Sequence, residues 1–113
     1  MIKVTIHRTK QNSIQSFKMT GHAFYAEHGQ DIVCAGASAV AVGTVNAIDQ
    51  LCGIKAEEHS VMESGLLEFV LPPLGEEAFQ KAQVLLEGMV VSLETIQMVY
   101  GDFIKIIQNV QEV

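Results

Sequence analysis

The longest stretch without a charged side chain constrains this chain most. Between Asp31 and Asp49 lie seventeen residues that carry no charge and are mostly alanine, valine and glycine. A helix of this composition has no charged face to turn toward water, so we expect it to be buried nearly all round. Asp31 is a suitable N-cap, the helix should run to about Leu51, and Gly53 is a plausible C-terminal stop.

The uncharged run is also close to the shortest length that can span a membrane. It is rich in alanine and glycine and contains Ser38, Thr44 and Asn46, which favours a buried helix in a soluble domain. The N-terminal residues alternate like a strand, and they lack the apolar core and cleavage site of a signal peptide. We therefore expect a cytoplasmic protein that does not bind a membrane.

Two strands are predicted before this helix. Apolar and polar residues alternate from Ile2 to His7 and again in the run Ile14–Thr20, which is typical of half-buried strands. The two should pair as an antiparallel hairpin, and Gly21 ends it because glycine lets the chain turn out of the sheet. Residues 23–30 follow neither period, so we expect a loop there, and loops on a rigid scaffold often carry function.

The second half of the chain predicts three more strands and one more long helix. Strands are expected over Ile54–Val61 and Gly65–Leu71, around a turn near residues 62–64. Apolar residues at three- and four-residue steps then predict an amphipathic helix over Glu76–Tyr100. The run Phe103–Val110 reads as a last strand.

The element order ββ-α-ββ-α-β predicts an α+β fold. We expect a two-layer sandwich in which a mixed five-stranded sheet carries both helices on one face.

The 113 residues are enough for a single domain with its own core. Hydrophobic residues make up 49% and charged residues 18%, which indicates a globular protein. The net charge is −6 and the seven Lys and Arg are scattered, which argues against direct nucleic-acid binding.

Cys34 is the first candidate for chemistry. Counted from Asp31 as the N-cap, it is the third helical residue. The unpaired N–H groups and the positive end of the helix dipole favour a thiolate over a thiol at this position. The alternative is a small buried hydrophobe, which most free cysteines are. Cys52 lies at the other end of the same helix, where the dipole opposes a thiolate, and we interpret it as structural.

Two histidines flank the predicted loop, and either could face Cys34. His22 directly follows a glycine at the end of an anchored strand, so its position is better determined than that of His28. A metal site formed by these three residues is conceivable, but their spacing matches no familiar zinc pattern. We therefore expect no metal and no other cofactor.

Ser38 and Asp31 are candidates for supporting roles. Ser38 lies one helical turn beyond Cys34, so both side chains share a face of the helix. Its hydroxyl could bind a substrate backbone or the carbonyl of its own helix, and the spacing does not separate the two. Asp31 is primarily a cap and could also orient a catalytic histidine.

The stretch from Gly21 to Ala39 contains Gly-His-Ala, then Gly-Gln-Asp-Ile-Val-Cys-Ala, then Ser-Ala. It resembles the signature of the ribosomal-processing cysteine proteases, small bacterial enzymes that remove a short N-terminal extension from ribosomal large-subunit protein twenty-seven. The resemblance extends over essentially the whole chain. It implies a homodimer, a mobile loop between the catalytic residues, and these site residues: His22 as base, Cys34 as nucleophile, and Gly21, Asp31 and Ser38 in substrate binding or orientation.

The chemistry implied by the resemblance is acyl transfer through a thioester. Cys34 would attack the scissile carbonyl, and His22 would protonate the leaving amine and then activate water. N–H groups near the helix start could form an oxyanion hole. Two other classes of function remain possible at this point. One is a noncatalytic ribosome-assembly binding module with an inert Cys34; the other is a thiol-redox protein, which the absence of a Cys-x-x-Cys motif disfavours.

Overall fold

The computed structural model describes residues 1–21 and 31–111. The predicted loop 23–30 lies outside the described residues, and so do His22 and His28. The elements in chain order are β1 (Ile2–Arg8), β2 (Ile14–Thr20), α1 (Ile32–Cys52), the 3-10 helix η1 (Ala56–Glu58), β3 (Ser60–Glu63), β4 (Leu66–Val70), α2 (Glu76–Tyr100) and β5 (Ile104–Val110).

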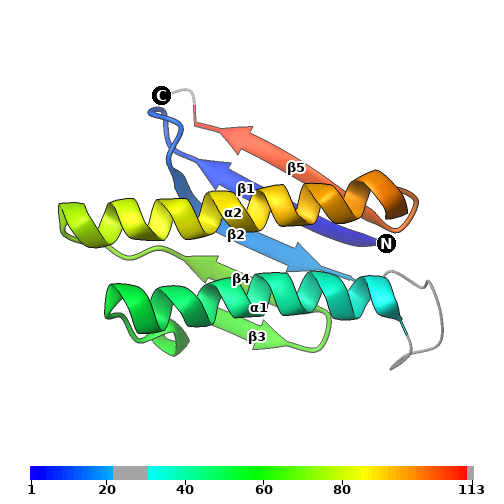
Figure 1. The fold of residues 1–113 in the computed structure, drawn as a ribbon, viewed down its shortest axis with the longest axis horizontal. Coiled ribbons are helices and arrows are strands. Elements are labelled where there is room, and N and C mark those ends of the chain that lie inside the picture. Colours follow the sequence, from blue (N-terminus) through cyan, green and yellow to red (C-terminus); the bar gives the residue numbers. More distant parts are fainter. Residues whose placement is uncertain (22–30, 112–113) are drawn as a thin grey trace.

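The strands form one mixed sheet of five, in the order β3-β4-β2-β1-β5. β1 pairs antiparallel with β2 and parallel with β5, and the other two pairings are antiparallel. Both helices lie on the same face of this sheet, side by side, with α1 over β3 and β4 (Figure 1). The predicted α+β sandwich is confirmed.

The core lies between the sheet and the two helices. Alternate residues of β1 are buried there, because successive side chains of a strand point to opposite faces. Phe17 of β2 and Phe69 of β4 are paired in the register, and their ring centroids are 6.1 Å apart. Such contacts bury large apolar areas, and each fully buried aromatic or aliphatic side chain contributes about 1.5–3 kcal/mol.

Helix α1 is not buried all round, so that prediction was wrong. One stripe is buried against the sheet: Val33, Ala37, Ala41, Val45 and Ile48. Ala35, Ala39 and Gly43 on the outer side are exposed. In a two-layer fold nothing in the described chain covers the outer side of the helices, and small side chains expose little apolar area there. α1 and α2 are long and apolar enough to span a bilayer by length and composition, a test that soluble core helices also pass.

The segment after α1 also differs from its prediction. Instead of a strand over Ile54–Val61, the chain forms η1 and then the short strand β3, and the turn falls at Ser64–Gly65. Asp49 explains the difference, because its Oδ2 accepts a hydrogen bond from the Ala56 N–H at 2.9 Å. Ser60 Oγ donates to the Ala56 carbonyl at 2.7 Å. These two bonds hold the chain in a turn where the residue pattern suggested an extended strand.

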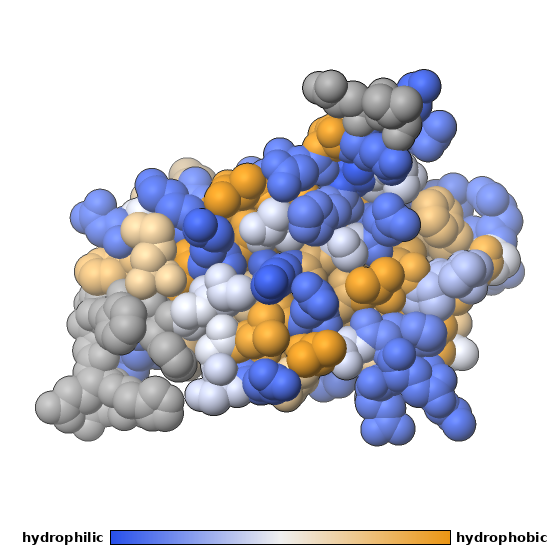
Figure 2. All heavy atoms as spheres, turned by 180° about the vertical axis from the view of Figure 1, so that it is seen from behind, coloured by the Kyte–Doolittle hydropathy of each residue, from blue (hydrophilic) through white to orange (hydrophobic). Residues whose placement is uncertain are grey.

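The other face of the sheet is open and mixed in character (Figure 2). Three of the seven basic residues share it, namely Lys3, Lys18 and Lys105, so the basic residues are less scattered than the linear sequence suggests. Lys3 is paired directly with Lys105, whereas Lys18 is paired with Glu68. The candidate site described next lies on the helix side of the sheet.

Candidate active site

The first turn of α1 is fixed by Asp31, as predicted. Its backbone is extended, and Oδ1 accepts hydrogen bonds from the N–H groups of Val33 at 3.1 Å and Cys34 at 3.0 Å. The Asp31 carbonyl accepts the first helical bond, from Ala35. The cap holds the Cys34 backbone in one place. It also occupies two N–H groups of the helix start, so while it is formed they cannot serve as oxyanion donors.

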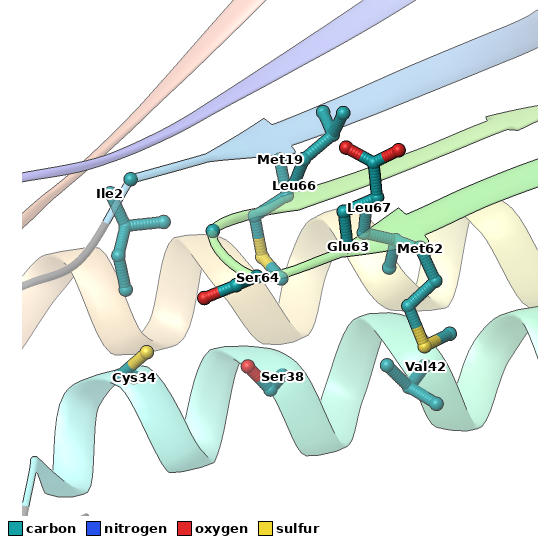
Figure 3. A pocket seen from close by; sticks show the side chains of 12 residues that line it. Ile2, Met19, Cys34, Ser38, Val42, Met62, Glu63, Ser64, Leu66 and Leu67 are labelled. Atoms are coloured by element: carbon teal, nitrogen blue, oxygen red, sulfur yellow. The ribbon is translucent and has the colours of Figure 1, made fainter. Parts of the chain in front are cut away.

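Cys34 opens onto a pocket of about 350 Å³. Cys34, Ser38 and Val42 lie four residues apart along α1 and line one wall, as four-residue spacing on a helix requires. Figure 3 shows the side chains of Cys34 and Ser38 pointing from α1 toward the β3–β4 hairpin. The Cys34 side chain is half-buried and packs against the hydrophobic core.

The opposite wall of the pocket is mostly apolar. It is formed by the β3–β4 hairpin, the end of β2 next to it and the start of β1 beyond β2, through Ile2, Met19, Met62, Ser64 and Leu67. Glu63 also borders the pocket, but its carboxylate points away from α1 (Figure 3). The space in front of the thiol therefore suits apolar side chains rather than charged ones.

Gly21 borders the same pocket and ends β2 in a conformation that favours glycine. Its φ is +89°, and its N–H donates to the Gly65 carbonyl at 2.9 Å. A Cβ at this position would overlap the carbonyl oxygen of Met1. Gly21 thus joins the end of β2 to the β3–β4 turn, and it fixes the point at which the chain leaves the sheet toward residue 22.

The Ser38 hydroxyl differs from those of the two helical threonines, Thr44 and Thr95. Thr44 Oγ1 donates to the Val40 carbonyl at 2.7 Å, and Thr95 Oγ1 donates to the Val91 carbonyl at 2.8 Å. Within residues 1–21 and 31–111, Ser38 Oγ makes no such bond to its own helix. Ser38 lines the pocket, and its role in substrate binding stays a prediction.

The structure thus brings Gly21, Cys34 and Ser38 to one pocket and makes Asp31 the cap beneath Cys34. It does not describe His22. The sequence reasoning missed Ile2, Met19 and Met62 as pocket residues. The sequence places Ile2 and Met19 near strand ends and Met62 in a turn, but only the sheet order brings the three together.

Cys52 is far from this pocket. It lies eighteen positions from Cys34 along α1, about 27 Å at 1.5 Å per residue. Neither cysteine is part of a disulfide. In the described part of the chain, no group of three His, Cys, Asp or Glu side chains could hold a metal ion.

A half-buried thiol in the first turn of a helix, facing an apolar pocket on a small α+β domain, is the arrangement expected of a cysteine-dependent hydrolase. Residues 1–105 match the family model described as cysteine protease Prp. The chain therefore belongs to this family and is a cysteine protease.

Relatives of known description support the same assignment. The ribosomal processing cysteine protease Prp of Bacillus subtilis (strain 168) is 49% identical over 111 residues, covering 97% of this chain and 99% of the relative. The crystal structure of the ribosomal processing protease Prp from S. aureus with a covalently linked product peptide has a TM-score of 0.84 at 34% identity. The structural match covers 96% of this chain and 100% of the S. aureus chain. The S. aureus protease with a substrate peptide has a TM-score of 0.79 at 33% identity, with the same coverage.

Proposed function

We propose that this protease removes a short N-terminal extension from the precursor of bacterial ribosomal large-subunit protein twenty-seven. The observation that carries the proposal is the Cys34 thiol, held by the Asp31 cap at the mouth of an apolar pocket. Relatives described as ribosomal processing proteases, one of them solved with a substrate peptide, supply the substrate class. The pocket suits an apolar segment bound next to the scissile bond.

In the proposed mechanism, His22 and Cys34 act as a dyad. The Cys34 thiolate attacks the scissile carbonyl carbon and forms a tetrahedral intermediate. This intermediate collapses when His22 donates a proton to the leaving amine nitrogen, which leaves a thioester on Sγ. His22 then takes a proton from water, the hydroxide attacks the thioester carbon, and the C–S bond breaks to give the carboxylic acid product and the Cys34 thiolate.

The oxyanion needs donors other than the N–H groups of Val33 and Cys34, which the Asp31 carboxylate already binds. The Ser38 hydroxyl is the donor that we assign to substrate, because it lines the pocket and makes no bond to its own helix within the described residues. A preorganised donor of this kind stabilises negative charge without reorganising in the transition state.

The proposed setting is the cytoplasm, with no direct contact to nucleic acid or membrane. The net charge of −6 suits a basic ribosomal protein as partner.

We also propose a homodimer. Val84, Val91 and Met98 support it, because they lie seven residues apart on α2 and are 72%, 62% and 86% exposed. A stripe of apolar residues at this spacing is typical of a helix-to-helix seam. A Val91→Lys variant should be monomeric by light scattering if α2 forms the dimer.

Cleavage of a synthetic peptide that spans the extension and the mature start tests the proposal. Purified protein should cleave it at one bond, and Cys34→Ala should lower kcat/KM by at least about a thousandfold with an unchanged fold. His22→Ala should lose a similar amount, because members of one catalytic unit are not additive. Cys52→Ala is the matched control and should retain activity. Binding of the peptide without cleavage would instead favour the noncatalytic assembly module.

A further inference from the structure

A second hollow of about 440 Å³ lies next to the pocket at Cys34, further along α1. Cys34, Ser38 and Val42 line the first, and Val45, Asn46 and Asp49 line the second. At 3.6 residues per turn these six positions fall within an arc of about 120° on one side of the helix. Met62 of β3 lines both hollows, so they are neighbours between α1 and β3, and we call the two together the groove.

The strand that borders this groove has an unpaired edge. β3 stands at the end of the sheet and, in the described ranges 1–21 and 31–111, it pairs only with β4. Val61 and Met62 are 43% and 59% exposed. An edge strand of this kind presents free N–H and C=O groups that an extended peptide can pair with, while pockets beside it take alternate side chains.

The groove has a defined length and a defined far end. Cys34 and Asp49 are fifteen positions apart, about 22 Å along the helix axis, which an extended peptide spans with about seven residues. At the far end, η1 is held against α1 by the bond from Ala56 N–H to Asp49. Asn46, Lys55 and Glu57 line that end, so it is more polar than the pocket at the thiol.

We propose that this groove is an extended substrate-binding site for the acyl side of the substrate. The peptide lies along the edge of β3, and a residue about six or seven positions before the scissile bond sits in the distal hollow. We assign the groove to the acyl side, the residues before the scissile bond, because this part stays attached to Cys34 Sγ in the thioester. It must remain bound while water attacks. This inference rests on the proposed function, since the acyl side of an N-terminal cleavage is the extension itself.

Peptide length and one groove variant test the inference. Two peptides share the scissile bond and differ in having about eight or about four residues before it, enough or too few to reach the distal hollow. The wild-type protein should cleave the longer one with a KM about tenfold lower. Asn46→Trp fills the distal hollow and should remove this preference. Gln50→Trp is the matched control, because Gln50 is exposed one turn further along α1 and lines neither hollow; it should keep the preference.

Two outcomes would overturn the inference: equal KM for both peptides with the wild type, or a preference that survives in Asn46→Trp. Thermal unfolding of each variant shows whether it is folded. If the wild type cleaves neither peptide, the proposed function fails separately. Anisotropy titration of both labelled peptides into Cys34→Ala, with and without Asn46→Trp, then still decides whether the groove binds the longer chain.

Discussion

The Arg8 guanidinium donates to both carboxylate oxygens of Glu87, from Nη1 at 2.7 Å and from Nη2 at 2.8 Å. The Arg8 side chain is 8% exposed and that of Glu87 is 47% exposed. Arg8 Nε also donates to Gln108 at 2.8 Å, and Nη1 donates to the Asn12 carbonyl at 3.0 Å. One buried cation at the end of β1 thus ties together α2, β5 and the turn after β1.

This pair makes stability depend on pH. The hydrogen bond from Arg8 holds the pKa of Glu87 below its ordinary value of 4.5. A carboxyl with a lowered folded-state pKa contributes stability that is present above its unfolded-state pKa and is lost as the pH falls through the folded one. Glu87→Gln should destabilise the protein at pH 7 by about 1 kcal/mol, a modest figure because Glu87 is half exposed.

Thermal or urea unfolding of Glu87→Gln and wild type between pH 7 and pH 3 checks this. The gap between the two proteins should shrink as the pH falls below 4.5. Glu58→Gln is the control, since Glu58 is exposed in η1 and its side chain makes no hydrogen bond or ion pair in the described chain. A gap that stays constant over this range would rule out ionisation of Glu87 as the cause.

Ser38→Ala should slow cleavage without destabilising the fold. If the hydroxyl donates to the substrate, its loss removes one hydrogen bond worth about 1–3 kcal/mol, which lowers kcat/KM about tenfold to a hundredfold. Thr44→Ala removes a hydroxyl that bonds only its own helix, and it should leave kcat/KM within about twofold. Equal activity of Ser38→Ala and wild type in steady-state assays would show that the hydroxyl is not used.

Asp31→Ala should destabilise the protein by about 1–2 kcal/mol, because one carboxylate oxygen accepts two N–H groups of the α1 start. Asn caps helices about as well as Asp, so Asp31→Asn should recover most of the loss. Urea unfolding at pH 7 measures both variants. A cost as large in Asp31→Asn as in Asp31→Ala would mean that the charge, rather than the cap, provides the stability.

Gly21→Ala should destabilise the protein by about 1–3 kcal/mol, because its positive φ disfavours any other residue and the added methyl overlaps Met1. Activity should fall as well, since Gly21 borders the pocket. Gly53→Ala is a useful comparison: its φ is also positive, at +71°, but nothing lies within 4 Å of the added carbon. If both variants lose the same stability, contact with Met1 has no effect.

Much of this fold follows from local patterns. Alternation in β1 and β2, the Asp31 cap and the three- and four-residue steps of α2 predict element types and order, because strands and helices each impose their own period. The turn at η1 could not be predicted in the same way. It depends on a hydrogen bond between Asp49 and Ala56, and apolar periodicity contains no sign of that bond.

The site was predictable in its polar residues and not in its apolar ones. Cys34 and Ser38 are one turn apart, so any helix brings them to one face. Met62 and Ile2 join them only because β3 and β1 belong to the same sheet under α1, which is a consequence of long-range pairing. The prediction that α1 is buried all round was wrong for a related reason. Composition shows which faces of a helix can be buried, whereas the number of layers in the fold decides which face is covered.

The contact between Gly21 and Met1 has a practical consequence for handling the protein. The amino terminus begins beside the pocket, since Met1 meets Gly21 and Ile2 lines the cavity in front of Cys34. The N–H of Gln111, at the opposite end of the described chain, donates to the Arg8 carbonyl at the other end of β1 (Figure 1). A purification tag fused ahead of Met1 would emerge at the mouth of the cavity and compete with peptide there, so affinity handles and surface-immobilisation points belong at the carboxyl end.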